Sequence, residues 1–343
     1  MTTDHALITA LVEGWRPETN TFHLPCGEAT VTLEDVAYIY GLPIDGPAVT
    51  SKALYSTGDT AKLCKDLLQK VPVPKRDSIG TRINFAWMKE ICKSDKKKKK
   101  KNEDEEKCKA MAYLFCLAGG QIVSNSTGTS AQAWLLSLFK EFKRYAWGPA
   151  CLANLYRMLS KVAMLSSSGD ENEDEKGKKF ICSPYEEIID KLTKVVHESD
   201  RNLFTSNTTM IFYWIVEQHN SERVMRQFGL RQMVPVPFQM PFDTADKVKK
   251  SLADYSISMK EIITIWETRE KTVVRGESDA SPTHEDSYMM WYALVMWLRI
   301  ASPFKEKVDD EPLTPTHATK GDDELLTPTH ATKGDDERLI PQS

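Results

Sequence analysis

The sequence ALVEGWRPETNTFHLPCGEATVTLEDVAYIYGLPIDG, residues 10–46, holds the clearest local structural signals in this chain. Within it, the runs TFHL (21–24) and ATV (29–31) flank the turn-forming sequence Pro-Cys-Gly at 25–27. Two β-prone runs around a short turn are typical of a β-hairpin. We therefore predict one short hairpin in this N-terminal stretch.

Helical signals dominate the rest of the chain. Directly after the hairpin, Thr32 followed by Asp35 is typical of a helix N-cap, and Gly41 is a typical helix stop. Apolar residues recur at helical spacing in five later stretches, which are 134–142, 152–163, 188–196, 211–228 and 288–298. We therefore predict a mainly α fold, namely a single α-helical domain with a small N-terminal β-hairpin.

The composition excludes several classes of protein. With 343 residues, 41% apolar and 27% charged residues and a formal net charge of −4, the chain is not a polycation that coats nucleic acid. No apolar run approaches the roughly 18 residues of a membrane span, and the N-terminus lacks the features of a signal peptide. Seven scattered cysteines without a Cys-x-x-Cys pair indicate reduced thiols.

Three polar segments interrupt or follow the predicted domain, which we place at 5–302. The segments 93–109 and 166–179 are strongly charged or glycine-containing, and we expect disordered loops there. From 303 to 343 we expect a disordered acidic tail, in which LTPTHATKGDDE occurs twice, starting at Leu313 and Leu326. Two such polar units are too few and too poor in apolar residues for a solenoid.

Motifs of common catalytic and cofactor sites are absent from the sequence. There is no Gly-x-Gly-x-x-Gly, no P-loop, no His-Glu-x-x-His and no Gly-x-Ser-x-Gly. His23 and Cys26 have a spacing that a metal could use, but no nearby pair supplies the two further ligands of a zinc site. We interpret them, and the isolated His219, as structural residues. We thus expect no catalytic residue, metal or cofactor, and no enzyme activity; an activity of unknown type is the weakest alternative.

Two groups of basic residues could contact partners. The first is an unbroken run of exposed lysines, which suits nuclear import or a phosphate backbone: Lys96, Lys97, Lys98, Lys99, Lys100 and Lys101. The second is a set of arginines in one block, Arg223, Arg226 and Arg231, of which the first two share a face at helical spacing. These arginines are candidate nucleic-acid or partner contacts, with intramolecular ion pairs as the alternative. The tryptophans, on helical faces without interleaved arginine, are expected to anchor the core or an interface.

Several blocks of the sequence, in this order, resemble the plant mobile domain of the MAIN-like (maintenance of meristems) proteins, also labelled aminotransferase-like. The blocks span nearly the whole predicted domain: 10–46, INFAWMKE (83–90), AYLFCLAGGQIVSNSTG (112–128), RYAWGPACLANLYRML (144–159), CSPYEEII (182–189), IVEQHNSERVMRQFGLRQMVP (215–235) and YMMWYALVMWLRIASP (288–303). After Leu159 the family carries a further apolar helix, whereas this chain has the polar segment 166–179. The resemblance therefore implies that one core helix is lost here.

The resemblance also implies a function. It implies nuclear localisation, a role in meristem maintenance, genome stability and transposable-element silencing, and cooperation with a phosphatase-like protein of the phosphoprotein phosphatase class. The sequence shows neither the lysine setting nor the phosphate cup of a pyridoxal enzyme, so it does not support the aminotransferase-like label. Our first hypothesis is a non-enzymatic nuclear protein-interaction module, with no membrane association. The alternative is a transposon-derived nucleic-acid-binding domain.

Overall fold

The computed structural model describes residues 4–51, 56–93, 103–124, 128–166, 196–236, 254–278 and 287–300, all within the compact unit Met1–Ile300. Four predictions fall wholly or mainly outside these ranges: the lysine run at 96–101, the loop at 166–179, the helix at 188–196 and the tail at 303–343. None of the helices in the described ranges has the length and apolar content that a membrane crossing requires.

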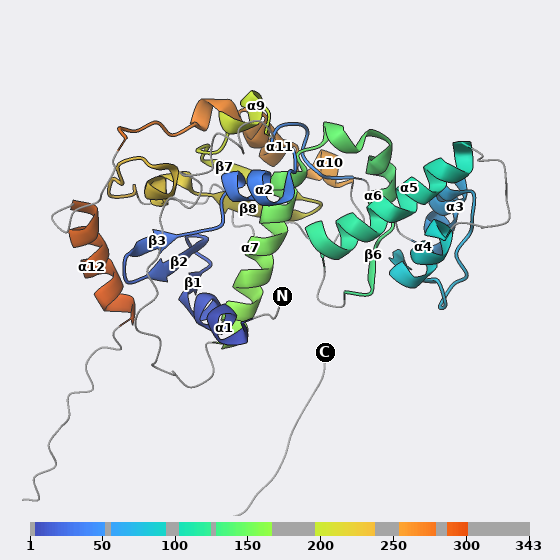
Figure 1. The fold of residues 1–343 in the computed structure, drawn as a ribbon, viewed down its shortest axis with the longest axis horizontal. Helices are drawn as coiled ribbons and strands as arrows, with labels where there is room; N and C mark the ends of the chain where they lie inside the picture. The colour runs from blue at the N-terminus through green and yellow to red at the C-terminus, as the bar shows by residue number, and fades with distance from the viewer. Residues whose placement is uncertain are drawn as a thin grey trace, which may run out of the picture. The chain divides into compact units, whose positions relative to one another are not determined.

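Helices make up most of the described structure (Figure 1). The α-helices are α1 (His5–Gly14), α2 (Leu33–Tyr40), α3 (Thr57–Leu68), α4 (Phe85–Cys92), α5 (Glu103–Leu117), α6 (Leu135–Leu138), α7 (Trp147–Ser166), α9 (Glu198–Arg201), α10 (Tyr255–Ser258), α11 (Lys260–Glu267) and α12 (Ser287–Ile300). Shorter helical turns are the π-helical η1 (Ala118–Ile122) and the 3-10 turns η2 (Phe139–Arg144), η4 (Ser221–Arg223), η5 (Met225–Phe228) and η6 (Arg269–Thr272).

The strands form three small antiparallel sheets. The first is β1 (Trp15–Arg16), β2 (Thr21–Leu24) and β3 (Gly27–Ala29); the second is β4 (Ser78–Ile79), β5 (Arg82–Asn84) and β6 (Ser130–Gln132); the third is β7 (Thr208–Phe212) and β8 (Ile215–His219). The prediction of a mainly α domain with a single N-terminal hairpin is therefore wrong, because the second and third sheets were not foreseen.

The clearest error concerns 211–228, predicted as a helix. These residues form most of the hairpin β7–β8, followed by η4 and η5. Ile211 pairs across the strands with Val216, and Phe212 pairs with Ile215. Apolar residues at these four positions fit one face of a helix and two cross-strand pairs equally well, so the spacing alone could not distinguish the two structures. Tyr213, with φ 58°, makes the turn that favours the hairpin.

Two further helical segments differ from the prediction in extent. The stretch 134–142 is a short α6 followed by η2, with a kink at Glu141 where φ is −127°. Residues 103–109, expected to belong to a disordered loop, form the first turns of α5. Their four consecutive acids lie at a helix N-terminus, where negative charge is favourable, and Lys107 and Lys109 pair with acids of the preceding turn.

The predicted N-terminal hairpin and the capped helix after it are both present in the structure. Thr32 and Asp35 form a capping box at the start of α2, and Gly41 ends this helix in the left-handed conformation. The second strand of the hairpin begins at Gly27 instead of residue 29, so that only Pro25 and Cys26 connect the strands. The predicted helices at 152–163 and 288–298 are confirmed as parts of α7 and α12.

Helix α7 lies at the centre of the main core, where it contacts α1, α2, β1 and the hairpin β7–β8 (Figure 1). In a second group of helices, α5 packs against both α3 and α4. Trp15, Trp134, Trp147 and Trp266 are almost fully buried, which confirms that these tryptophans anchor the core. Since large aromatic side chains bury the most apolar area, they dominate the stabilisation of this interior.

Candidate functional site

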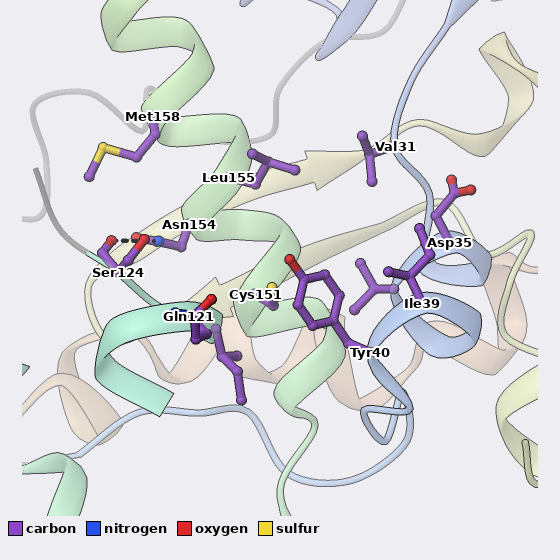
Figure 2. A pocket seen from close by; sticks show the side chains of 12 residues that line it. Val31, Asp35, Ile39, Tyr40, Gln121, Ser124, Cys151, Asn154, Leu155 and Met158 are labelled. Carbon is purple, nitrogen blue, oxygen red and sulfur yellow. Dashed lines mark hydrogen bonds between the residues drawn. The ribbon is translucent and has the colours of Figure 1, made fainter. Parts of the chain in front are cut away.

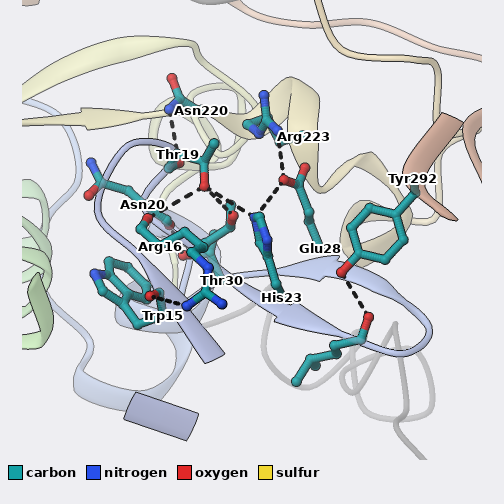
Figure 3. A network of polar contacts seen from close by, with 12 residues as sticks. Trp15, Arg16, Thr19, Asn20, His23, Glu28, Thr30, Asn220, Arg223 and Tyr292 are labelled. Carbon is teal, nitrogen blue, oxygen red and sulfur yellow. Dashed lines mark hydrogen bonds and ion pairs between the residues drawn. The ribbon is translucent and has the colours of Figure 1, made fainter. Parts of the chain in front are cut away.

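A buried polar network joins the first sheet to the block that carries the predicted arginines (Figure 3). His23 on β2 and Glu28 on β3 are cross-strand neighbours, and His23 Nε2 lies 3.0 Å from Glu28 Oε1. The same carboxylate oxygen accepts a hydrogen bond from the Arg223 guanidinium at 2.6 Å. The side chains of His23 and Glu28 are 2% and 1% exposed, so this three-residue cluster is an interior ion-pair network.

The geometry of this cluster does not match a nucleophile–base–acid relay. In such a relay the histidine uses one ring nitrogen for the nucleophile and the other for the carboxylate. Here Nε2 is the nitrogen near both Glu28 and the Thr19 hydroxyl, which lies 3.5 Å away. His23 Nδ1 is buried and has no hydrogen-bond partner in the described structure. The cluster is thus suited to holding segments together.

Helix α12 extends the same junction. The hydroxyl of Tyr288 accepts a hydrogen bond from the backbone N–H of Glu28 at 3.0 Å, and that of Tyr292 donates to the carbonyl of Leu24 at 2.8 Å. Burial raises the pKa of both tyrosines, so both are neutral donors or acceptors near pH 7. The hairpin is therefore linked to the arginine block and to α12, although it is 195 residues from Arg223 and 260 residues from Tyr288 in sequence.

The three predicted arginines have different environments. Arg223 is 11% exposed and is committed to Glu28. The guanidinium of Arg226 lies 4.5 Å from the centre of the Tyr288 ring and donates to the carbonyl of Cys26. Arg231 is 58% exposed, with a long 3.9 Å ion pair to Glu277. All three thus make intramolecular contacts, and they do not form one exposed basic patch.

The histidines singled out from the sequence are also part of the interior. Burial lowers the pKa of His219 to about 4, so its ring is neutral near pH 7, and its Nδ1–H donates to the carbonyl of Ser206 at 2.8 Å. Cys26 is exposed at the turn, whereas His23 faces Glu28. In the described part of the chain, no three side chains of His, Cys, Asp or Glu are grouped as metal ligands, and the six cysteines present there are free thiols.

A separate, mostly apolar pocket opens between α2, α7 and the end of η1 (Figure 2). Its volume is about 160 Å³, close to the roughly 150 Å³ of an apolar protein cavity that holds benzene. The lining residues are Val31, Asp35, Val36, Ile39, Tyr40, Gln121, Ile122, Ser124, Cys151, Asn154, Leu155 and Met158. Such a pocket fits one large apolar group.

Glu34 belongs to the same helix, α2, as one wall of the pocket. Burial, with the adjacent Asp35 charge as a smaller cause, raises the pKa of Glu34 to about 7. A carboxyl group at a helix N-terminus would normally be favoured in its charged form, so the cost of removing it from water dominates here. Glu34 is therefore partly protonated at neutral pH.

Replacing Glu34 by glutamine is expected to stabilise the chain at high pH. Between about pH 4.5 and 7 the folded state holds a proton on Glu34 that the unfolded state has lost, so wild-type stability from this group falls as pH rises. Glu34→Gln removes that loss, so it should raise the free energy of unfolding by about 2 kcal/mol at pH 8 and leave it unchanged at pH 4. Urea titrations at the two pH values measure the difference. Glu267→Gln, on an exposed part of α11, should change it by less than about 0.5 kcal/mol at both pH values. An equal gain at both pH values would contradict this explanation.

A protein-family model described as plant mobile domain matches residues 1–172 and 170–293. From Arabidopsis thaliana, the Serine/threonine-protein phosphatase 7 long form homolog is 31% identical over 89% of this chain, Protein MAIN-LIKE 1 is 32% identical over 86%, and Protein MAINTENANCE OF MERISTEMS is 29% identical over 84%. The chain spans 28%, 67% and 69% of these relatives, respectively. No solved structure matches this chain. The chain belongs to the MAIN-like plant mobile domain family, as its sequence blocks predicted.

Sequence reasoning missed Glu28 and the pocket. Glu28 was missed because the predicted second strand began at residue 29, whereas the observed register pairs Glu28 directly with His23 across the strands. The pocket had no local signal, since its walls come from three segments that only the tertiary fold brings together.

Proposed function

We propose that this chain is a non-enzymatic nuclear module that binds a phosphatase-like protein and acts with it in meristem maintenance, genome stability and transposable-element silencing. The observation that carries the proposal is the contrast between the two candidate surfaces. Two of the arginines that were candidates for phosphate binding make contacts within the fold: Arg223 forms an ion pair with Glu28, and Arg226 lies over the Tyr288 ring. The apolar pocket, in contrast, is open. An open apolar pocket favours protein recognition over nucleic-acid recognition.

The relatives support a phosphatase as partner. One of them is named a phosphatase homolog, and this chain matches only 28% of its length. A domain of this type is therefore part of a much longer chain that bears a phosphatase name. This name favours a phosphatase-like protein over other classes as the partner of the domain.

The experiment that tests the proposal is affinity purification of the tagged chain from plant nuclei, with and without nuclease, followed by mass spectrometry. We expect a phosphatase-like protein that remains bound after nuclease treatment. Recovery of chromatin proteins only without nuclease would support the nucleic-acid alternative, for which the exposed Arg231 is the best remaining contact. In that case affinity for DNA or RNA should fall steeply with salt.

Deleting Lys96 to Lys101 is expected to reduce nuclear accumulation. Six consecutive lysines supply the dense positive charge that an import receptor recognises. The measurement is the nuclear-to-cytoplasmic ratio of the chain fused to a tandem fluorescent protein, which makes passive entry slow. Deletion of the equally long polar sequence at 171–176 is the control and should leave the ratio unchanged. An unchanged ratio after removal of the lysines would contradict the import role.

A further inference from the structure

The tetrapeptide Val-Pro-Val-Pro occurs twice in the chain, at 71–74 and at 234–237. The structure describes the first copy completely and the first three residues of the second, so both copies can be compared over a Val-Pro-Val segment, at 71–73 and at 234–236. Neither segment belongs to a helix or a strand. The first follows α3 and the second follows η5, so any property that they share comes from the motif and not from a common neighbouring element.

Both segments expose their valines and bury the proline between them. In chain order, the valines are 53% and 46% exposed at 71–73, and 38% and 70% exposed at 234–236, whereas Pro72 and Pro235 are buried. Four of the five exposed valines in the described part of the chain lie in these two segments. Single exposed apolar residues are ordinary on protein surfaces, but the same exposed pair at two places indicates a surface that contacts a partner.

A buried polar side chain anchors each segment to the fold. Asp77, which is 5% exposed, accepts a hydrogen bond from the Val73 N–H at 2.8 Å, and its own N–H donates to the Val73 carbonyl at 2.8 Å. Gln232, which is 2% exposed, donates to the carbonyl of Met233, directly before the second segment, at 2.9 Å. The exposed valines are therefore presented by backbone that the fold holds in place.

The alternation of valine with proline favours extended backbone. Proline fixes its own φ at about −65° and restricts the residue before it to extended conformations, so every residue of the motif is restricted. A ligand that is already extended loses little entropy when it binds.

The backbone hydrogen bonds of the first segment limit how a partner can recognise it. Proline has no N–H to donate, and the N–H and the carbonyl of Val73 are both bonded to Asp77. The segment therefore cannot supply the regular main-chain hydrogen bonds of a strand added to a partner's sheet. The mode that remains for an extended, proline-containing ligand is side-chain contact in an aromatic-lined groove.

The charges around both segments indicate the charge of the partner. Lys70 and Lys75 flank the first copy of the motif and are exposed, and Arg231, three residues before the second copy, is 58% exposed. No acidic residue occurs at 67–76 or at 223–242 of the sequence. A groove with acidic residues at its rim is complementary to these surroundings.

We propose that the Val-Pro-Val segments at 71–73 and 234–236 are two docking sites for a partner domain that binds extended, proline-containing segments in an aromatic-lined groove with an acidic rim. The inference goes beyond the proposed function, because it names a different class of partner and does not depend on a phosphatase-like protein.

The test is isothermal titration of the full chain with a panel of purified SH3, WW and EVH1 domains, which bind proline-rich ligands in such grooves. We expect binding of at least one of these domains, with two sites per chain. Val73→Asp and Val236→Asp should each weaken one site about tenfold, because a carboxylate opposes both the apolar contact and the acidic rim, and the double variant should lose both sites.

The matched control for the titration is Val162→Asp. Val162 is 45% exposed, close to the 46% of Val73, but it lies on α7 outside both segments. This variant should keep both sites, and thermal unfolding should show all the variants to be folded, since the three positions are exposed. The proposal is overturned if no domain of the panel binds wild type, or if the double variant binds as wild type does.

Photo-crosslinking tests the same sites without adding a charge. The amino acid p-benzoylphenylalanine is placed at position 73, 236 or 162 of the full tagged chain in plant cells, and crosslinked peptides are identified by mass spectrometry. We expect positions 73 and 236, but not 162, to crosslink to a domain with an aromatic-lined, acidic-rimmed groove. Crosslinks only within this chain or to a second copy of it, or equal yields at all three positions, would contradict the assignment.

Discussion

Replacing Arg223 by alanine is expected to lower the free energy of unfolding by about 3–5 kcal/mol, the usual cost of removing one partner from a buried ion pair. The carboxylate of Glu28 is 1% exposed, and its second oxygen has no hydrogen-bond partner in the described structure. Loss of Arg223 would leave this charge beside His23 without its guanidinium partner. Chemical denaturation followed by tryptophan fluorescence measures the change.

The matched control is Arg231→Ala. Arg231 belongs to the same block, but it is 58% exposed and its ion pair with Glu277 spans 3.9 Å. Exposed pairs of this kind contribute less than about 1 kcal/mol, so stability should hardly change. The double variant Glu28→Leu/Arg223→Leu should recover most of the loss, because it removes the buried charge together with its partner. If Arg223→Ala were as stable as wild type, Arg223 would not have the structural role assigned to it here.

Replacing Gly46 by alanine is expected to destabilise the chain by about 4 kcal/mol, combining backbone strain with overpacking. Gly46 has φ +126°, a conformation that side-chain-bearing residues rarely adopt. A Cβ atom at this position would lie 2.3 Å from the carbonyl oxygen of Arg144, just before α7. The carbonyl of Gly46 also accepts a hydrogen bond from the buried Trp266 indole at 2.9 Å. A shift of the backbone at Gly46 would therefore disturb both the start of α7 and the end of α11.

Gly41→Ala separates the two causes. Gly41 also has a positive φ, +62°, but within the described ranges no heavy atom beyond its chain neighbours lies within 4 Å of the position its Cβ would take. Its replacement should cost about 1 kcal/mol, the strain of a left-handed residue alone. Thermal unfolding of both variants measures the difference. Equal losses for the two glycines would show that the close approach at Gly46 has no energetic consequence.

The sequence by itself determined the features that depend on neighbouring residues. The capping box of Thr32 and Asp35, the stop at Gly41 and the helical faces of α7 and α12 follow from local spacing, and the structure confirms them. The family was also readable, because long blocks of sequence resemble it without reference to any contact. Local chemistry is sufficient for such features, since caps and periodic faces involve residues only a few positions apart.

The tertiary structure alone decided the features that join distant segments. Ile211 and Val216 fit a helix or a hairpin, and in the folded chain they form a cross-strand pair in a hairpin that packs against α7. The sequence made Arg223 a candidate for phosphate binding, but in the structure it pairs with Glu28, which is 195 residues away in sequence. The apolar pocket beside Ile39 is lined by three segments that are distant in the sequence. In each case the deciding term is burial or charge pairing between remote residues, which no local pattern in the sequence encodes.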